Sequence, residues 1–124
     1  MGNPGEASIG VIFQDGEHTL KNISRTIGTQ TNNVAEYTAL VSALQEAQAM
    51  KIASITVYTD SELLCKQMSG AYRVKNEALK HLFQKAQHLI RNFESVRIQQ
   101  IPREKNRGAD KLARLAIKNK HTVK

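Results

Sequence analysis

Apolar residues recur along this 124-residue chain with two different periods, which predict where strands and helices form. Apolar and polar residues alternate in the first part of the chain, and Asp15-Gly16 between two such stretches is typical of a hairpin turn. Two later runs are short and rich in β-branched residues, which also favours strands. The strands predicted in this way cover residues 7–13, 19–27, 54–59 and 96–101.

Apolar residues at three- and four-residue steps predict four helices. Thr31-Asn32-Asn33 supplies capping residues before the first helix, and Gly70 closes the second. The order is then two strands, a helix, a strand, two helices, a strand and a helix, which predicts an α/β fold with a mixed sheet covered by helices. The first predicted helix has its apolar positions over residues 34–47, and the other three span residues 60–70, 76–93 and 106–119.

The length and composition predict one domain, residues 1–119, followed by a basic tail, residues 120–124. About 40% of the residues are hydrophobic, which is enough for a core. Cys65 is the only cysteine and cannot form an internal disulfide, which fits a reducing compartment. The start of the chain shows no signal-peptide pattern, and the longest apolar stretch is far shorter than a membrane span. We therefore expect a cytoplasmic protein without a membrane partner.

The net charge of +7 is distributed unevenly along the chain. Residues 1–65 carry three basic and seven acidic side chains, whereas residues 66–124 carry fifteen basic and four acidic ones. This asymmetry points to a polyanionic partner, with nucleic acid first, although a solvated basic surface explains the charge alone equally well. Two clusters of cations lie near predicted helix starts and are candidates for phosphate contacts. They are Arg73, Lys75 and Lys80, and Lys105, Arg107 and Lys111.

Three carboxylates, Glu36, Asp60 and Asp110, lie where a predicted strand ends or a predicted helix begins. Each has a structural explanation, since Asn33-x-x-Glu36 matches a capping box, Asp60 suits an N-cap, and Asp110 complements a helix dipole. Together they come from three separate elements. Converging carboxylates repel one another unless a cation neutralises them, and Mg²⁺ prefers oxygen ligands. A metal site is thus a hypothesis beside the capping one.

Sequence motifs along the chain resemble, in order and spacing, those of ribonuclease H type 1, and the resemblance runs from residue 2 to about residue 117. Two of them are similar to the archaeal and bacterial-homologue branch, which lacks the basic protrusion of the long form. The motifs are Gly2-Asn3-Pro4-Gly5, Thr31-Asn32-Asn33-x-x-Glu36, Tyr58-Thr59-Asp60-Ser61, Gln67-x-x-x-x-Tyr72-Arg73-Val74-Lys75-Asn76 with Ile101-Pro102-Arg103-Glu104, and Asn106-x-x-Ala109-Asp110-x-Leu112-Ala113.

The resemblance implies a three-layer ribonuclease H-like fold and metal-dependent cleavage of the RNA strand of RNA–DNA hybrids. The family site holds two Mg²⁺ or Mn²⁺ ions between four carboxylates, three of which correspond to Glu36, Asp60 and Asp110. Paired ions suit an in-line displacement at phosphorus. The resemblance and the basic residues further predict a set of nucleic-acid contacts, although turn and cap chemistry explains the asparagines equally well. The predicted contacts are Asn3, Asn32, Asn33, Ser61, Arg73, Lys75 and Arg103.

The resemblance departs from the family at the start, because the family carries its first aspartate on a strand that precedes the position of Gly2. That aspartate bridges both ions, so we expect its absence to impair hydrolysis. Its strand normally lies in mid-sheet, and without it we expect two open strand edges that pair with another chain or close on each other. The sequence leaves open a truncated product, a misplaced start, or a naturally shortened, inactive homologue.

Other residues give weaker signals. No histidine precedes the last predicted helix, where some family members have one, and Arg103 is the candidate replacement. His81 and His88 avoid the apolar positions of their helix and are expected to be solvated. Cys65 has no accompanying His–Asn arrangement and is expected to pack beneath a helix. The hypotheses are therefore a hybrid-specific endoribonuclease, a nucleic-acid-binding module without hydrolysis, and a self-associating domain that forms a homo-oligomer through open strand edges.

Overall fold

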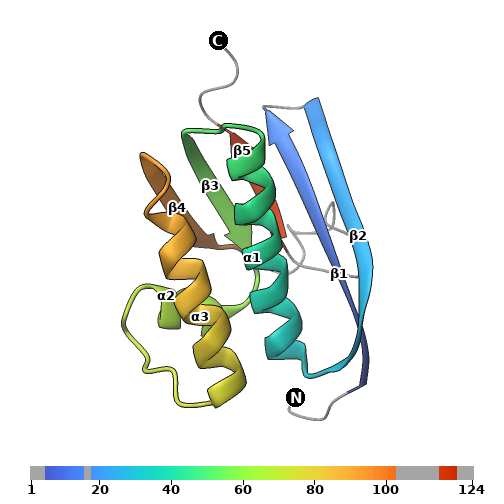
Figure 1. Cartoon of the computed structure of the whole chain (residues 1–124), viewed down its shortest axis with the longest axis vertical. Helices are drawn as coiled ribbons and strands as arrows, with labels where there is room; N and C mark the ends of the chain where they lie inside the picture. The colour runs from blue at the N-terminus through green and yellow to red at the C-terminus, as the bar shows by residue number, and fades with distance from the viewer. Residues whose placement is uncertain (1–4, 16–17, 103–114, 120–124) are drawn as a thin grey trace.

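The computed structural model describes residues 5–15, 18–102 and 115–119, and the fold is given for these residues. They form a five-stranded sheet with three helices (Figure 1). The elements in chain order are β1 (Gly5–Asp15), β2 (His18–Gln30), α1 (Asn32–Ala49), β3 (Ser54–Thr59), α2 (Glu62–Met68), α3 (Glu77–Ile90), β4 (Ser95–Gln100) and β5 (Leu115–Asn119).

The sheet is mixed, with the strand order β2-β1-β5-β3-β4. The long hairpin β1–β2 is antiparallel, and β3 and β4 are parallel, with Ser54 opposite Ser95. The predictions of an α/β fold, of the hairpin and of the strand over 54–59 are confirmed, since β3 has those bounds. The hairpin strands are longer than the alternating pattern predicted because polar residues continue the antiparallel pairing beyond the apolar positions.

The centre of the sheet corrects one prediction. Residues 106–119 were expected to form a helix, but Leu115–Asn119 forms β5, while residues 106–114 lie outside the described ranges. β5 runs parallel to β1, with Val11 opposite Leu115, and antiparallel to β3, with Thr59 opposite Leu115. The facing edges of β1 and β3 are therefore paired through β5, not open and not paired directly. A strand forms here because it pairs with the backbone N–H and C=O groups of both neighbouring strands.

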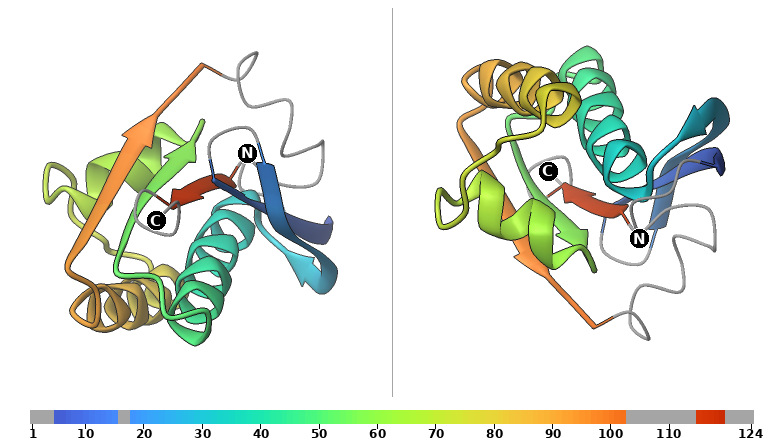
Figure 2. Two further views of the ribbon diagram at one scale, coloured as in Figure 1. Left: turned by 90° about the horizontal axis from the view of Figure 1, so that it is seen from above. Right: turned by 90° about the horizontal axis from the view of Figure 1, so that it is seen from below.

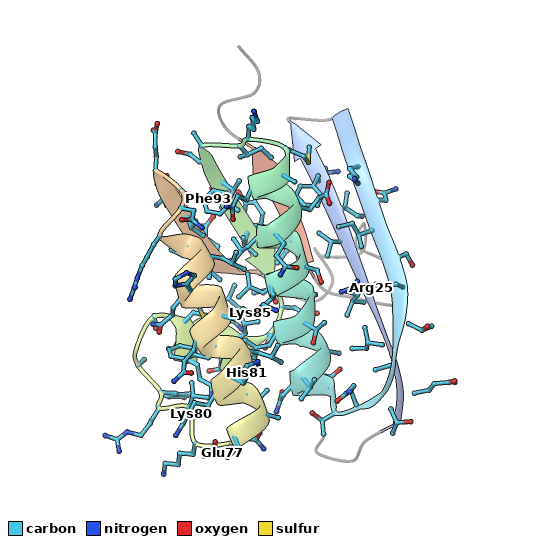
Figure 3. The ribbon with its side chains drawn as sticks, viewed as in Figure 1. Arg25, Glu77, Lys80, His81, Lys85 and Phe93 are labelled. Carbon is cyan, nitrogen blue, oxygen red and sulfur yellow. The ribbon has the colours of Figure 1, made fainter. Side chains whose placement is uncertain are left out.

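Helices α1 and α3 lie side by side on one face of the sheet (Figure 2). The predicted apolar stripe of α1 is confirmed, and it packs on β1 residues Ile9, Val11 and Phe13, which share one face as the alternation predicted. α3 begins after Asn76, whose side-chain oxygen accepts from the Leu79 N–H. Its outer face carries exposed His81 and His88, so both are solvated as predicted, and His81 and Lys85 are labelled in Figure 3.

Two polar contacts join the hairpin to α1 beside this core. The Arg25 guanidinium donates to Ser42 Oγ at 2.8 Å (Figure 3), and Lys21 forms an ion pair of 2.6 Å with Glu46. Both cations come from β2, the edge strand, so they hold the edge of the sheet against the helix that carries Glu36.

Candidate active site

Glu36 lies in the second turn of α1, and the start of this helix differs from the predicted capping box. The N-cap is Thr31, whose extended backbone lets its hydroxyl accept from the Val34 N–H at 3.2 Å. The helix therefore begins two residues earlier than an Asn33 cap requires. Glu36 is then too far along the helix to cap it, and its side chain is 8% exposed. A carboxylate with so little exposure and no capping role is a candidate for chemistry.

Asp60 follows the last residue of β3, at the sheet end from which α2 continues. The predicted N-cap role of Asp60 is also wrong, because Ser61 caps α2 through a hydroxyl that accepts from the Leu64 N–H at 3.1 Å. Thr59 is buried and its hydroxyl accepts from the Ser61 N–H at 3.1 Å. This pair of hydroxyl contacts sets the backbone turn on which Asp60 sits.

Glu36 lies where α1 meets α2, since the next residue, Tyr37, is hydrogen-bonded to Gln67 of α2. The Cys65 thiol lies one turn into α2. Its pKa is raised first by burial and then by the negative charge of Glu36, against a smaller lowering by Lys66. One Glu36 carboxylate oxygen and both Asp60 carboxylate oxygens are shielded from solvent. The raised pKa keeps the half-buried thiol protonated at neutral pH, which agrees with a packing role for Cys65.

The two carboxylates fit a divalent cation by donor chemistry. Hard cations such as Mg²⁺ take oxygen ligands, and shielded carboxylates from two rigid elements supply them. Asp110, the third predicted ligand, lies outside the described residues. Within the described ranges, no cluster of three or more His, Cys, Asp or Glu side chains forms a complete metal site. Glu36 and Asp60 therefore remain two candidate ligands, and Asp110 stays a prediction.

A buried hydrogen-bond network joins α1 to α2 beside Glu36. Tyr37, the residue after Glu36, donates its hydroxyl to Gln67 Oε1 of α2 at 2.8 Å. The Gln67 amide nitrogen donates in turn to the backbone carbonyl oxygen of Arg73 at 3.4 Å. Burial, with a smaller contribution from Cys65, raises the pKa of Tyr37 to about 12, so the phenol remains a donor over the whole neutral range.

The predicted nucleic-acid contacts fall into three groups. Arg73 and Lys75 are exposed in the segment between α2 and α3. Asn32 and Asn33 open α1, and Ser61 uses its hydroxyl to cap α2, so these three lie at the helix starts near Glu36 and Asp60. The remaining predicted contacts, Asn3 and Arg103, lie outside the described residues.

Sequence reasoning placed the N-cap of α1 at Asn33 and not at Thr31, and it missed the roles of Tyr37 and Gln67. Thr31 had a local signal, because a threonine three residues before a helical N–H is a common cap. Tyr37 was assigned only to the apolar stripe, and Gln67 only to a motif. Their contact joins residues 30 positions apart, and no periodicity reports such a pair.

Comparisons with known proteins show the family and the fold of this chain. The family model described as Reverse transcriptase-like matches residues 2–116. The chain is 37% identical over 118 residues to the bifunctional protein Rv2228c of Mycobacterium tuberculosis, covering 94% of this chain and 32% of that protein. It is 36% identical over 117 residues to ribonuclease HI of Halobacterium salinarum, covering 94% of this chain and 59% of that protein. The chain thus spans about a third to three-fifths of the length of these curated relatives.

Solved structures show the same fold. The N-terminal RNase H domain of Rv2228c superposes with a TM-score of 0.84, covering 91% of this chain and 83% of that one. RNase H1 of Halobacterium salinarum superposes with a TM-score of 0.83, covering 91% of this chain and 86% of that one. LC11-RNase H1, solved in complex with an RNA/DNA hybrid, is 43% identical in sequence. It superposes with a TM-score of 0.82, covering 91% of this chain and 86% of that one. Among the described helices, none is both long and apolar enough to cross a membrane.

Proposed function

This chain belongs to the reverse transcriptase-like family and carries a ribonuclease H-like domain, and from that premise we propose that it hydrolyses the RNA strand of RNA–DNA hybrids. The observation that carries the proposal is a pair of shielded carboxylates, Glu36 in the second turn of α1 and Asp60 directly after β3. The likeness to ribonucleases H, one of them solved with an RNA/DNA hybrid, supports the choice of substrate.

The proposed catalytic residues and metal ligands are Glu36 and Asp60, with Asp110 as a third. Two Mg²⁺ or Mn²⁺ ions would supply charge stabilisation at the reacting phosphate when bound. The chain's own contribution is to hold its carboxylates at fixed positions, since α1 carries Glu36 and the Thr59–Ser61 turn carries Asp60. Fixed ligands avoid reorganisation during the reaction.

The proposed hybrid contacts come from several segments of the chain. Asn32, Asn33 and Ser61 lie at the helix starts next to them, where short polar side chains can bond a ribose 2′-hydroxyl. Arg73 and Lys75 are exposed at the far end of α2, where they can reach the phosphate backbone. We include Asn3 and Arg103 in the same proposal on the strength of the sequence resemblance.

The test is cleavage of an end-labelled RNA–DNA hybrid in Mg²⁺ and in Mn²⁺, by the chain and by its Asp60→Asn and Glu36→Gln variants. Replacing the partners of metal ligands already costs about 10–100-fold, so we expect loss of a ligand to lower the cleavage rate by more than about 100-fold. Calorimetry should show weaker Mn²⁺ binding by both variants. Glu62→Gln is the matched control, because Glu62 is exposed two residues beyond Asp60 and loses the same charge.

Two outcomes would contradict the proposal. Equal cleavage by the chain and Asp60→Asn would remove Asp60 from the site. Binding of the hybrid with no cleavage by the chain in either metal would favour a nucleic-acid-binding module. Duplex RNA and duplex DNA of the same sequence, run in parallel, test the substrate class separately from the metal ligands.

A further inference from the structure

We propose that Gln67 is a positioning residue: it holds the segment Ser69–Lys75 so that Tyr72 and Arg73 make a second contact with the backbone of the nucleic acid. This contact lies apart from the carboxylates. The inference rests on the proposed function for the identity of the bound polymer, but not on hydrolysis.

The geometry around Gln67 carries the proposal. Its side chain is 5% exposed and makes both of its hydrogen bonds to other elements. Oε1 accepts from the Tyr37 hydroxyl on α1, and Nε2 donates to the Arg73 carbonyl oxygen in the following segment. One buried amide therefore joins α1, α2 and the α2–α3 segment. A buried polar side chain satisfied in this way specifies one arrangement of its neighbours.

The segment itself is held at several points although most of its side chains face solvent. The Tyr72 N–H donates to the Lys66 carbonyl oxygen at 3.0 Å, and Val74 is 8% exposed and belongs to the core. Gly70 has a φ of 90°, which lets the chain reverse after α2. Figure 1 shows this segment, between α2 and α3, projecting from the side of the fold. A segment pinned at Val74 and at the Arg73 carbonyl presents its outward side chains in a fixed orientation.

The outward side chains suit a phosphate backbone. Tyr72 is 49% exposed and is the large apolar residue most open to solvent among those described. Arg73 and Lys75 follow it in the chain, and residues 63–76 contain three cations and no acidic residue. Within the described ranges, the recorded ion pairs are those of Lys21 with Glu46 and of Lys80 with Glu77, so no ion pair holds Arg73 or Lys75. Arginine and tyrosine side chains are common donors to phosphate and sugar oxygens.

The same amide links this surface to the carboxylates. Tyr37 follows Glu36 directly in the chain, and α2, which carries Gln67, starts directly after Asp60 and Ser61. A shift of Gln67 would therefore move the basic segment relative to both acidic residues. This explains why a neutral, buried side chain should control how the chain binds a charged polymer.

The experiment measures binding of a short fluorescein-labelled RNA–DNA hybrid in EDTA, by anisotropy over a range of salt concentrations. Arg73→Gln should lower the slope of log affinity against log salt by about one unit, the loss of one phosphate contact. Gln67→Met keeps the side-chain volume but loses both hydrogen bonds, and Gln67→Glu loses the donor to Arg73. Both should lower the slope by about as much as Arg73→Gln, although neither removes a cation.

Controls separate positioning from folding. Lys85→Gln removes a charge from the exposed face of α3 and should leave the slope unchanged. Hydrogen exchange should show faster exchange of the amides of residues 69–75 in Gln67→Met, with β3 and α1 still protected. A merely structural role of Gln67 would change stability without changing the salt slope of the folded protein. If Gln67→Met fails to fold, Gln67→Glu, which keeps an acceptor for Tyr37, supplies the same comparison.

The outcomes distinguish this proposal from the proposed hydrolysis. A folded Gln67→Met or Gln67→Glu variant with the slope of the unmodified chain overturns the positioning role. If Arg73→Gln binds the hybrid as the unmodified chain does, the proposed contact of Tyr72 and Arg73 with the nucleic acid is wrong, even if the chain cleaves the hybrid. Binding that is weakened by Arg73→Gln and by the Gln67 variants, in a chain that cleaves nothing, supports this inference while the hydrolase proposal fails.

Discussion

Replacing Tyr37 with phenylalanine removes one hydroxyl from the core and leaves the aromatic ring in place. The ring is 1% exposed, and the hydroxyl donates to Gln67 Oε1 at 2.8 Å. Because Gln67 is itself buried, the variant leaves its oxygen without this donor. Such a loss lowers the free energy of unfolding by about 1–3 kcal/mol. For a domain of this size, each kcal/mol lowers the melting temperature by roughly 4 °C.

The pH dependence makes this prediction specific to the phenol. Burial, aided by Cys65, raises the pKa of Tyr37 from 10.0 to about 12 in the folded state. Between these values the unfolded chain loses the phenol proton while the folded chain keeps it. The stability that the neutral phenol contributes is therefore complete below pH 10 and is lost as the pH rises toward 12. Two pKa units correspond to about 3 kcal/mol.

The assay is urea denaturation followed by circular dichroism at pH 7 and at intervals from pH 9 to pH 12. The chain should be more stable than Tyr37→Phe at pH 7, and the difference should shrink to about zero by pH 12, because phenylalanine does not titrate. Comparing the two proteins at each pH cancels the titration of the groups that do not interact with Tyr37. Equal stabilities at pH 7, or a difference that stays constant up to pH 12, would refute the reasoning.

Two further predictions concern the elements around the site. Ser61→Ala removes the cap of α2 and should lower the free energy of unfolding by about 1 kcal/mol in urea denaturation, whereas Ser24→Ala, at an exposed position of β2, should have little effect; equal effects would argue against the cap. Deletion of residues 115–119 removes a strand paired on both sides and should abolish cooperative unfolding, and a deletion variant with a native-like thermal transition would contradict the placement of β5.

Local patterns predicted much of the sheet and the two long helices. The strand over 54–59, the hairpin and the apolar stripes of α1 and α3 follow from periodicity, because each of these elements buries one continuous face. The place of Asp60 directly after the third strand was also predicted. The helix caps were assigned one or two residues away, because several neighbouring residues can each cap a helix and only the backbone geometry selects one.

The tertiary structure alone decided the state of Leu115–Asn119 and the partner of Tyr37. A five-residue run with apolar residues at mixed spacing is compatible with a helix or a strand, and the backbone groups of β1 and β3 select the strand. The contact of Tyr37 with Gln67 joins residues far apart in the chain, so no local period contains it. The sequence by itself determined the periodic elements and the residue types available for chemistry. Folding determined which of them meet, because pairing edges and buried hydrogen bonds exist only once distant segments come together.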